Sequence, residues 1–217
     1  MDMEQARFNM IEQQIRPWEV LDPAVLDLLS TVRREDFVPE GSQLLAFADV
    51  ELPLANGSSM LEPKVEARLL QEAAVKESDK VLEIGAGSGY MAALLAARAA
   101  SVTSVEIDGA QLEVARQNLA RAGISKVNLV KGDGARGWAN GAPYDVIVVS
   151  ASLPVLPNEM LQQLKVGGRL VAIVGEAPAM EAQLVVRTGE STFNTVNLFE
   201  TVTAPLQNAV QREQFVF

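Results

Sequence analysis

Residues 81–90 read Val81-Leu82-Glu83-Ile84-Gly85-Ala86-Gly87-Ser88-Gly89-Tyr90, and they indicate the fold class more clearly than any other stretch. An apolar strand runs directly into a Gly-x-Gly-x-Gly turn, which opens onto a helix of small residues expected at 91–100. Glycines let the backbone come into contact with a ligand, and the N-terminus of the following helix offers unpaired N–H donors. The stretch therefore predicts a nucleotide-cradling loop.

Acidic residues end the next two apolar runs of the chain. Glu106 follows the run at 102–105 and comes 21 positions after Gly85 (106 − 85). A carboxylate at this place accepts hydrogen bonds from both hydroxyls of a ribose. Asp133 closes the strand expected at 127–130, where its carboxylate is suited to accept from an adenine amino group. The loop and the two acids together predict an adenosine-containing cofactor.

Two details separate this loop from a dinucleotide-binding fingerprint. That fingerprint reads G-x-G-x-x-G/A, and its last glycine allows close packing of helix on strand. Here Tyr90 stands at that position, and the third glycine, Gly89, comes one residue earlier. Glu83 stands just before the glycines, where its carboxylate suits a positively charged amino group better than a pyrophosphate. The combination resembles the S-adenosylmethionine (SAM) site of class I methyltransferases.

Composition limits the classes of function that remain. The 217 residues are 48% apolar, which predicts one domain with a substantial core. A formal charge of −10 disfavours nucleic-acid binding, because phosphate neutralisation needs a basic face. The chain has no cysteine and no histidine, so it lacks thiolate ligands, disulfides and the usual general base. We expect no metal site, because the carboxylates are scattered singly.

The N-terminus and the hydropathy pattern bear on localisation. The start, Met1-Asp2-Met3-Glu4-Gln5, is acidic and polar and does not resemble a signal peptide. No apolar run approaches the length needed to span a membrane. We therefore expect a cytoplasmic protein without a membrane partner.

From Lys80 onward, strand and helix patterns alternate. This alternation predicts an α/β fold with a doubly wound, Rossmann-like, mostly parallel sheet, whose ligands bind at the carboxyl ends of the strands. The segments at 183–187 and 195–202, joined through Gly189-Glu190-Ser191, are predicted to be antiparallel edge strands. The expected parallel strands are 81–84, 102–106, 127–130, 146–150 and 169–174, and the expected helices are 91–100, 110–122 and 158–164.

The first 62 residues do not show the alternation of strand and helix patterns. Phe8, Ile11 and Ile15 mark one face of a helix that Pro17 ends, and Asp22-Pro23 starts a second helix. An irregular stretch then leads to Pro63, which starts a third helix. We expect one methyltransferase domain over 1–217, with a helical cap and substrate loop at 1–62 and a Rossmann-like core at 63–217.

Nearly the whole length resembles the protein-L-isoaspartate O-methyltransferases. The resemblance implies SAM-dependent methylation of the free α-carboxylate of isoaspartyl residues in damaged proteins, with isoaspartyl proteins or peptides as substrates. The segments that carry it are Met10–Ile15, Arg34–Pro39, Ala46–Asp49, Leu52–Leu54, Val81–Tyr90, Val105–Ile107, Gly132–Gly134, Tyr144–Ser150, Leu164–Leu170 and Ala204–Leu206. The cofactor-binding residues that it implies are Glu83, Gly85, Ala86, Gly87, Ser88, Gly89, Glu106, Ile107, Gly132, Asp133, Gly134 and Ser150.

The active-site motif departs from the family. There the family reads glycine, a polar residue, Thr, an aliphatic residue, Ser, any residue and Pro, whereas this chain reads Gly57-Ser58-Ser59-Met60-Leu61-Glu62-Pro63. Ser59 keeps a hydroxyl, but Leu61 replaces the serine; Asn56 stands where the family usually has histidine, and Ala151-Ser152-Leu153-Pro154 is bulkier than its counterpart. The candidate catalytic residues are Ser59 and Asp49, the latter orienting the loop.

Three functions remain compatible with these residues. In the first, Ser59 takes over the hydroxyl contacts and isoaspartyl carboxylates are methylated; a carboxylate is already a nucleophile at neutral pH and needs only alignment. In the second, Leu61 and Leu153 line a more apolar pocket for another carboxyl or hydroxyl substrate, such as a small molecule. In the third, Leu61 closes the site of a non-catalytic SAM-binding protein. The oligomeric state stays open, and the apolar end Gln214-Phe215-Val216-Phe217 is a candidate docking segment.

Overall fold

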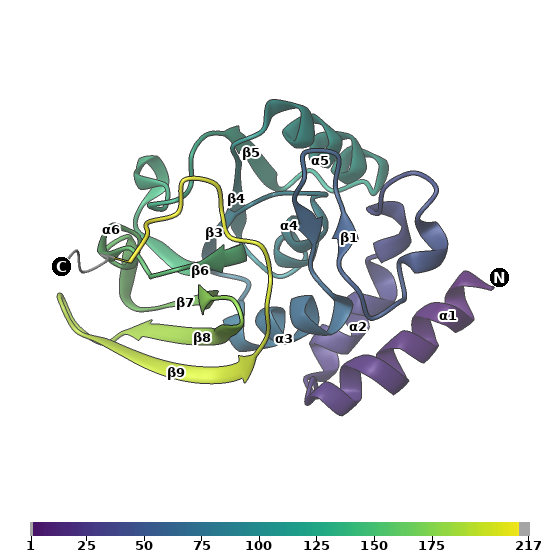
Figure 1. Cartoon of the computed structure of the whole chain (residues 1–217), viewed down its shortest axis with the longest axis horizontal. Coiled ribbons are helices and arrows are strands. Elements are labelled where there is room, and N and C mark those ends of the chain that lie inside the picture. The colour runs from purple at the N-terminus through teal and green to yellow at the C-terminus, as the bar shows by residue number, and fades with distance from the viewer. Residues whose placement is uncertain (1, 213–217) are drawn as a thin grey trace.

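A computed structural model describes residues 2–212 of the chain as a sheet with helices on both faces (Figure 1). The seven-stranded sheet has the order β5-β4-β3-β6-β7-β8-β9. Neighbours from β5 to β7 run parallel, and β8 and β9 are antiparallel additions. The doubly wound, mostly parallel fold predicted from the sequence is confirmed. The strands are β3 Lys80–Ile84, β4 Ser101–Glu106, β5 Val127–Lys131, β6 Tyr144–Leu153, β7 Leu164–Glu176, β8 Ala179–Arg187 and β9 Phe193–Glu200.

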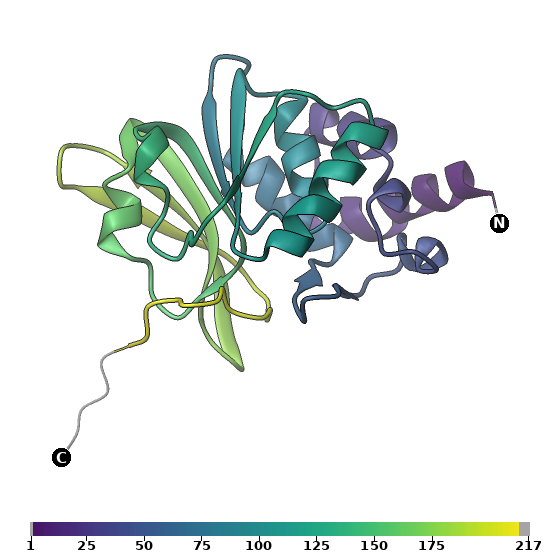
Figure 2. The ribbon, with the colours of Figure 1, turned by 90° about the horizontal axis from the view of Figure 1, so that it is seen from above.

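Helices α3, α4 and α5 lie on one side of the sheet and α6 on the other (Figure 2). Side chains alternate along each strand, so every strand contributes to two cores. Val81 belongs to the core under the N-terminal helices, whereas its neighbour Leu82 belongs to the core on the α6 side. The α-helices are α1 Met3–Met10, α2 Pro23–Thr31, α3 Pro63–Ala73, α4 Tyr90–Ala96, α5 Gly109–Arg121 and α6 Asn158–Leu161.

Shorter elements complete the chain. A π-helical turn at Ile11–Ile15 continues α1, and a small separate sheet pairs β1 (Leu52–Pro53) with β2 (Ser59–Met60). The 3₁₀ turns are Arg16–Trp18, Arg34–Asp36, Gln43–Leu45 and Ala139–Gly141. The stretch expected to be irregular before Pro63 thus contains a short hairpin.

The start of α2 follows the predicted cap, but the first helix differs from its prediction. The Asp22 carboxylate accepts a hydrogen bond from the Ala24 N–H at 2.8 Å, and Pro23 takes the first helical position. Phe8, expected on the inward face, is 57% exposed. The buried face instead runs through Met10, Ile11 and Ile15, because the chain widens into a π-helical turn after Met10.

Several boundaries in the core differ from the prediction. Helix α4 ends at Ala96 rather than at 100, and α6 ends at Leu161 rather than at 164. Strand β7 already begins at Leu164, so the glycine turn at 166–168 lies within the strand. Strand β8 is not an edge strand, because β9 pairs along its free side.

Residues after β9 form a strap over the carboxyl ends of the parallel strands, seen in Figure 1 as the yellow chain that crosses in front of the sheet. We define the strap as residues 203–209. It forms an isolated bridge with β6, in which the Ser152 N–H donates to Ala204 O at 3.0 Å and the Leu206 N–H donates to Ser152 O at 2.9 Å. At its end, the Asn208 amide donates to Asp133 Oδ2 at 2.9 Å.

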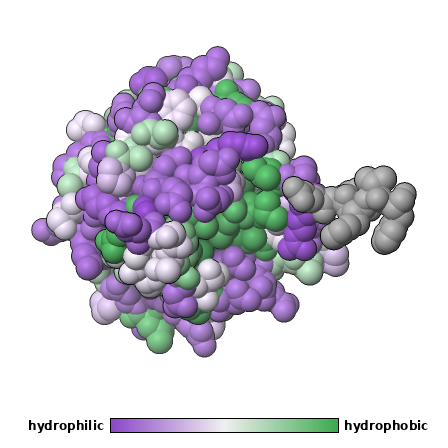
Figure 3. Space-filling view, turned by 90° about the vertical axis from the view of Figure 1, so that its left-hand side faces the viewer, coloured by the Kyte–Doolittle hydropathy of each residue, from purple (hydrophilic) through white to green (hydrophobic). Residues whose placement is uncertain are grey.

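The surface on the side of α6 is largely hydrophilic, with a hydrophobic area near its centre (Figure 3). The apolar segment Gln214–Phe217 lies outside the described residues. Within residues 2–212, no helix combines the length and the apolar character that a membrane crossing requires.

Candidate functional site

The glycine loop after β3 adopts a backbone that other residues rarely tolerate. Gly85, Gly87 and Gly89 have φ angles of 89°, 51° and 85°, in the left-handed region. At Gly89 an added Cβ would also lie 3.2 Å from Ala115 O, so this glycine lets the loop pack closely on α5. The loop conformation therefore explains the spacing of the glycines in the sequence.

Glu106 closes one side of the crevice that the loop forms. Its Oε2 accepts from the Gly87 N–H at 3.0 Å and its Oε1 accepts from the Asp108 N–H at 3.1 Å. Glu106 as a whole residue is 6% exposed, and it lines a cavity of about 90 Å³. Of the residues predicted from the sequence, this cavity brings together Ser59, Gly85, Gly87, Glu106, Ile107 and Ser150.

Glu83 lies fully buried behind the loop. Two hydroxyls donate to its carboxyl group, Ser104 Oγ at 2.6 Å and Ser150 Oγ at 3.1 Å. Burial raises the pKa of Glu83 to about 8; the two hydroxyls oppose this shift, and the nearby Glu106 charge adds to it. Glu83 lines a second cavity of about 20 Å³, together with Ala86, Ser88 and Ser59.

Neither acid of the crevice has a cationic partner. Among residues 2–212, no lysine or arginine nitrogen lies within 4.0 Å of Glu83 or Glu106, whereas the other two buried glutamates, Glu35 and Glu66, pair with arginines. Uncompensated carboxylates favour a ligand that carries positive charge and hydroxyl donors. A sulfonium nucleoside with an amino-acid arm has both features, so the residues present fit the predicted cofactor.

The third predicted acid serves a different set of contacts. Asp133 Oδ1 accepts from the Ala135 N–H at 2.9 Å and Oδ2 accepts from Asn208, and Asp133 lines neither cavity. Gly132 leaves room for the Trp138 ring, and at Gly134 an added Cβ would lie 2.6 Å from Ile84 Cγ2. The contacts of these three residues, 132–134, are therefore ones of packing and of anchoring the strap.

The substrate loop places one of the two candidate catalytic residues at the crevice. Ser59, in β2, lines both cavities. Asp49 lines neither; it accepts from Lys64 Nζ at 2.7 Å on the surface. Asn56 Oδ1 accepts from the Ser58 N–H and hydroxyl at 3.1 and 2.7 Å, so this amide shapes the turn.

The two leucines singled out in the sequence have different surroundings. Leu61 is 3% exposed and lines the smaller cavity beside Ser59. Leu153, expected to line the same pocket, is instead fully buried in the core on the α6 side, because it ends strand β6 in register with Val174. The structure thus brings only Leu61 to the site.

Two groups of site residues were not predicted. Ser104 reaches Glu83 because the two residues are register partners on neighbouring parallel strands; a polar residue inside an apolar strand was the available signal. Strap residues 203–207 line the larger cavity, which no local pattern indicated. At about 90 Å³ this cavity is smaller than the roughly 300 Å³ of a small ligand pocket.

The chain is similar over most of its length to proteins of one family. The family model described as Protein-L-isoaspartate(D-aspartate) O-methyltransferase (PCMT) matches residues 5–211. The chain is 43% identical over 190 residues to protein-L-isoaspartate O-methyltransferase 1 of Rhodopseudomonas palustris strain HaA2, covering 88% of this chain and 77% of the relative. It is 41% identical over 201 residues to a protein-L-isoaspartate O-methyltransferase of R. palustris strain CGA009, covering 92% of each.

Two solved structures share the fold of this chain. A structure named protein-L-isoaspartate O-methyltransferase aligns with a TM-score of 0.81 and 25% identity, covering 96% of this chain and 67% of that one. A candidate protein-L-isoaspartate O-methyltransferase from Plasmodium falciparum, in complex with S-adenosyl-L-homocysteine, aligns with a TM-score of 0.79 and 16% identity over 95% and 99% of the chains. The chain therefore belongs to the protein-L-isoaspartate(D-aspartate) O-methyltransferase family.

Proposed function

We propose that the protein is a SAM-dependent methyltransferase that methylates the carboxylate of isoaspartyl residues in damaged proteins. One observation carries this function: the family match over residues 5–211 includes a glycine-loop crevice whose two buried acids, Glu83 and Glu106, have no cationic partner in the described chain. A cationic adenosine cofactor supplies the missing partner, and isoaspartyl proteins are the substrates.

The cofactor's role is limited to one chemical contribution: when bound, SAM supplies an electrophilic methyl group. Glu106 accepts hydrogen bonds from the ribose hydroxyls, for which its Oε1 and Oε2 stand at the mouth of the loop. Glu83 faces the amino group and stays oriented by the Ser104 and Ser150 hydroxyls. The remaining residues of the glycine loop act through its backbone, and Ile107 lines the larger cavity. Residues 132–134 act indirectly, by packing and by anchoring the strap at Asp133.

The substrate needs orientation rather than activation. A carboxylate is ionised at neutral pH and is itself the nucleophile, so the absence of histidine and cysteine leaves no gap in the chemistry. The Ser59 hydroxyl, at the wall shared by both cavities, donates to the substrate carboxylate and holds it at the near-attack distance of ~3–3.5 Å.

Leu61 changes the shape of the site without removing its hydroxyl chemistry. Ser59 and Leu61 both line the smaller cavity, so the hydroxyl and the apolar volume of Leu61 border the same space. We expect Leu61 to narrow the range of side chains accepted next to the isoaspartyl residue.

The hydrophobic core and the composition bear on the domain organisation and on the location of the protein. We propose a single domain in which the cap and substrate loop (1–62) pack on the Rossmann-like core (63–217). One hydrophobic cluster supports this, because it contains Met10 and Phe37 from the cap together with Leu69 and Val146 from the core. We also propose that the protein acts in the cytoplasm, in agreement with a chain free of cysteine.

The decisive experiment is methyl transfer from labelled SAM to a synthetic isoaspartyl peptide, with its aspartyl twin as the matched control. Base-labile label on the isoaspartyl peptide alone is the expected result. Binding of SAM, measured by calorimetry, without transfer to either peptide would instead favour a protein that keeps its cofactor and has lost or changed its substrate.

A further inference from the structure

Arg34 is the most deeply buried charged side chain near the crevice that the proposed chemistry does not use. Its side chain is 1% exposed, and it lies in the 3₁₀ turn Arg34–Asp36 of the cap. Its guanidinium stacks over the Tyr90 ring at 5.3 Å from the centroid and pairs with Glu66 of α3. Burial lowers the pKa of Arg34 to about 10, so the side chain still carries its charge at neutral pH.

The guanidinium of Arg34 also binds two main-chain carbonyls that lie far apart in the sequence. Arg34 Nε donates to Ala46 O at 3.0 Å, and Arg34 Nη2 donates to Leu61 O at 2.8 Å. These two carbonyls are the two ends of the segment 46–61. That segment carries Asn56, Ser58 and Ser59 to the larger cavity. One side chain therefore holds both ends of the loop that forms the substrate side of the crevice.

The other partners of Arg34 tie this loop to the cofactor side. Tyr90 directly follows the last glycine of the loop after β3, and it lines the smaller cavity together with Glu66 and Ser59. Both carbonyl contacts use the backbone, so they are independent of the side chain that stands at position 61. Arg34 thus connects the cap, the substrate loop and the glycine loop through a single rigid fork.

We propose that Arg34 is a positioning residue that fixes the 46–61 loop, and with it the Ser59 hydroxyl, against the cofactor crevice. The inference rests on the proposed function for its kinetic readout. A lysine at this position keeps the charge for Glu66 but has a single nitrogen, which cannot reach Ala46 O, Leu61 O and Glu66 in the same fork geometry.

The test compares Arg34→Lys with Arg7→Lys. Arg7 is the matched control, because it is also buried in the cap and pairs with an acid, Glu35, while its other hydrogen bond in the described chain goes to Ser30 O. Two kinds of readout are measured for each variant. The first is methylation kinetics on the isoaspartyl peptide together with calorimetric affinity for S-adenosyl-L-homocysteine, and the second is amide hydrogen exchange across residues 54–60.

For Arg34→Lys we expect kcat to fall about 10- to 100-fold while affinity for S-adenosyl-L-homocysteine stays within about threefold, because a small displacement of an aligning group affects the reacting geometry most. We expect the protected amides of the loop, Leu54 N–H bonded to Ser58 O and Gly57 N–H bonded to Leu54 O, to exchange at least about tenfold faster. Arg7→Lys leaves both readouts near wild type.

Each other outcome decides the question. If Arg34→Lys and Arg7→Lys behave alike in kcat and in loop exchange, Arg34 has only a structural role and the proposal is wrong. If the wild-type protein methylates no isoaspartyl peptide, the proposed function fails, and hydrogen exchange alone decides on the loop. If Arg34→Lys does not fold, Glu66→Gln takes its place. It removes the charged partner that holds the guanidinium in place, so loop exchange is expected to become faster, and unchanged loop exchange would overturn the proposal.

Discussion

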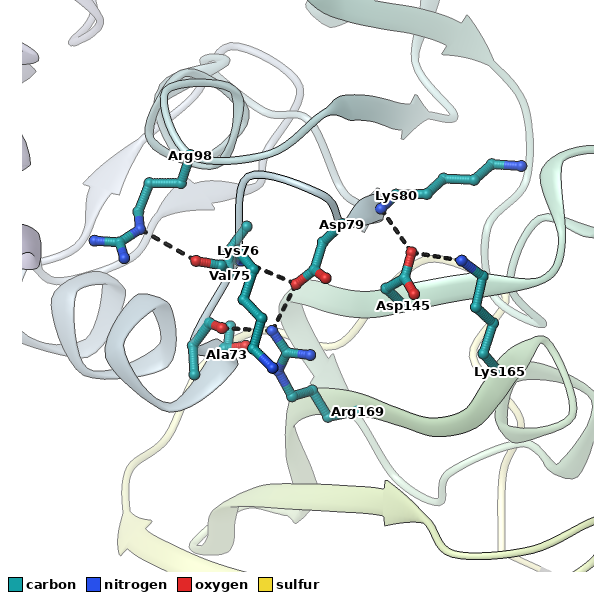
Figure 4. A network of polar contacts seen from close by, with 10 residues as sticks. Ala73, Val75, Lys76, Asp79, Lys80, Arg98, Asp145, Lys165 and Arg169 are labelled. Carbon is teal, nitrogen blue, oxygen red and sulfur yellow. Dashed lines mark hydrogen bonds and ion pairs between the residues drawn. The ribbon is translucent and has the colours of Figure 1, made fainter.

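At the amino ends of the parallel strands, the acids Asp79 and Asp145 each lie against a cation, whereas at the carboxyl ends Glu83 and Glu106 do not. The Asp79 carboxylate accepts from Arg169 at 2.7 Å just before β3. Asp145, near the start of β6, accepts from Lys165 Nζ and from the Lys80 N–H, both at 2.8 Å (Figure 4).

The network at the amino ends joins elements that are distant in the sequence. Besides Asp79, Arg169 donates to the carbonyls of Ala73 and Ala74 at the end of α3, which have no partner within the helix. Partial burial tends to raise the pKa of Asp145, but the hydrogen bonds from Lys165 and the Lys80 backbone outweigh it and lower that pKa. Both acids of this network are therefore paired with a cation.

At the carboxyl ends of the strands, the acids have no cationic partner among the described residues. Glu83 and Glu106 are satisfied only by hydroxyl and N–H donors, and burial of acids without a cation costs stability. A ligand that supplies the positive charge recovers that cost as binding free energy. The same strands thus hold the fold together at one end and keep a site for a cation at the other.

The largest effect is expected from breaking the paired end. Arg169→Met leaves the buried Asp79 carboxylate with the Lys76 N–H but without its cation, and it leaves two helix carbonyls without their side-chain donor. The free energy of unfolding is therefore expected to fall by about 3 kcal/mol. Affinity for S-adenosyl-L-homocysteine is expected to stay within threefold. Urea unfolding and calorimetry measure the two quantities, with Arg116→Met, at an exposed helix pair, as the control. A large loss of affinity in a variant that remains folded would show that the two ends are coupled.

The second effect concerns the unpaired end. Glu106→Ala removes the acceptor for the ribose hydroxyls, and we expect affinity for SAM to fall about 30-fold, which corresponds to about 2 kcal/mol for a charged hydrogen bond. The fold is expected to remain intact. The control is Glu113→Ala, an exposed acid of α5. Unchanged calorimetric affinity in Glu106→Ala would refute the ribose assignment.

The glycine loop shows how much local sequence reveals. The strand, the glycine positions and the acid Glu106 follow one another within a single βαβ unit, so spacing alone predicted their place. The prediction of α3 also succeeded, because Pro63 and the apolar positions Val65, Leu69 and Leu70 are local signals.

Long-range contacts explain what could not be predicted. The strap reaches the crevice because Ser152 pairs with residues about fifty positions later, and Arg34 acts through Leu61, 27 positions away. Leu153 was misassigned because its surroundings depend on the register of β6 with β7, which has shifts between Val148 and Ser152. Such contacts leave no periodic pattern along the chain.

The third effect is a difference in how Glu83, at the carboxyl ends, and Asp145, at the amino ends, make stability depend on pH. The pKa of Glu83 is raised to about 8, above its ordinary value of 4.5, so between these values the folded state holds a proton that the unfolded state has released. Stability without cofactor is therefore expected to fall as pH rises from 5 to 8, by up to about 1.4 kcal/mol per pH unit from this group, and Glu83→Gln is expected to remove that slope. The lowered pKa of Asp145 acts in the opposite sense, since its stabilisation is lost below pH 3.8.

Urea unfolding of wild type, Glu83→Gln and the exposed control Glu113→Gln across this pH range measures the slope. The difference between wild type and Glu83→Gln should change steadily with pH, while Glu113→Gln should run parallel to wild type. Parallel curves for all three would mean that Glu83 titrates in the folded protein as it does in the unfolded chain.

The smallest effect tests whether the contrast between paired structural acids and unpaired site acids also holds outside the sheet. Asp49 was predicted to be catalytic, yet it pairs with Lys64 at 2.7 Å and lines neither cavity. By its pairing it belongs with the acids of the amino ends, although it lies in the substrate loop. Asp49→Asn is therefore expected to cost about 0.5 kcal/mol of stability and to change kcat for the isoaspartyl peptide less than about twofold. A kcat loss above tenfold with unchanged stability would mean that a paired acid can serve the reaction, and the distinction between paired and unpaired acids would then hold only for the sheet.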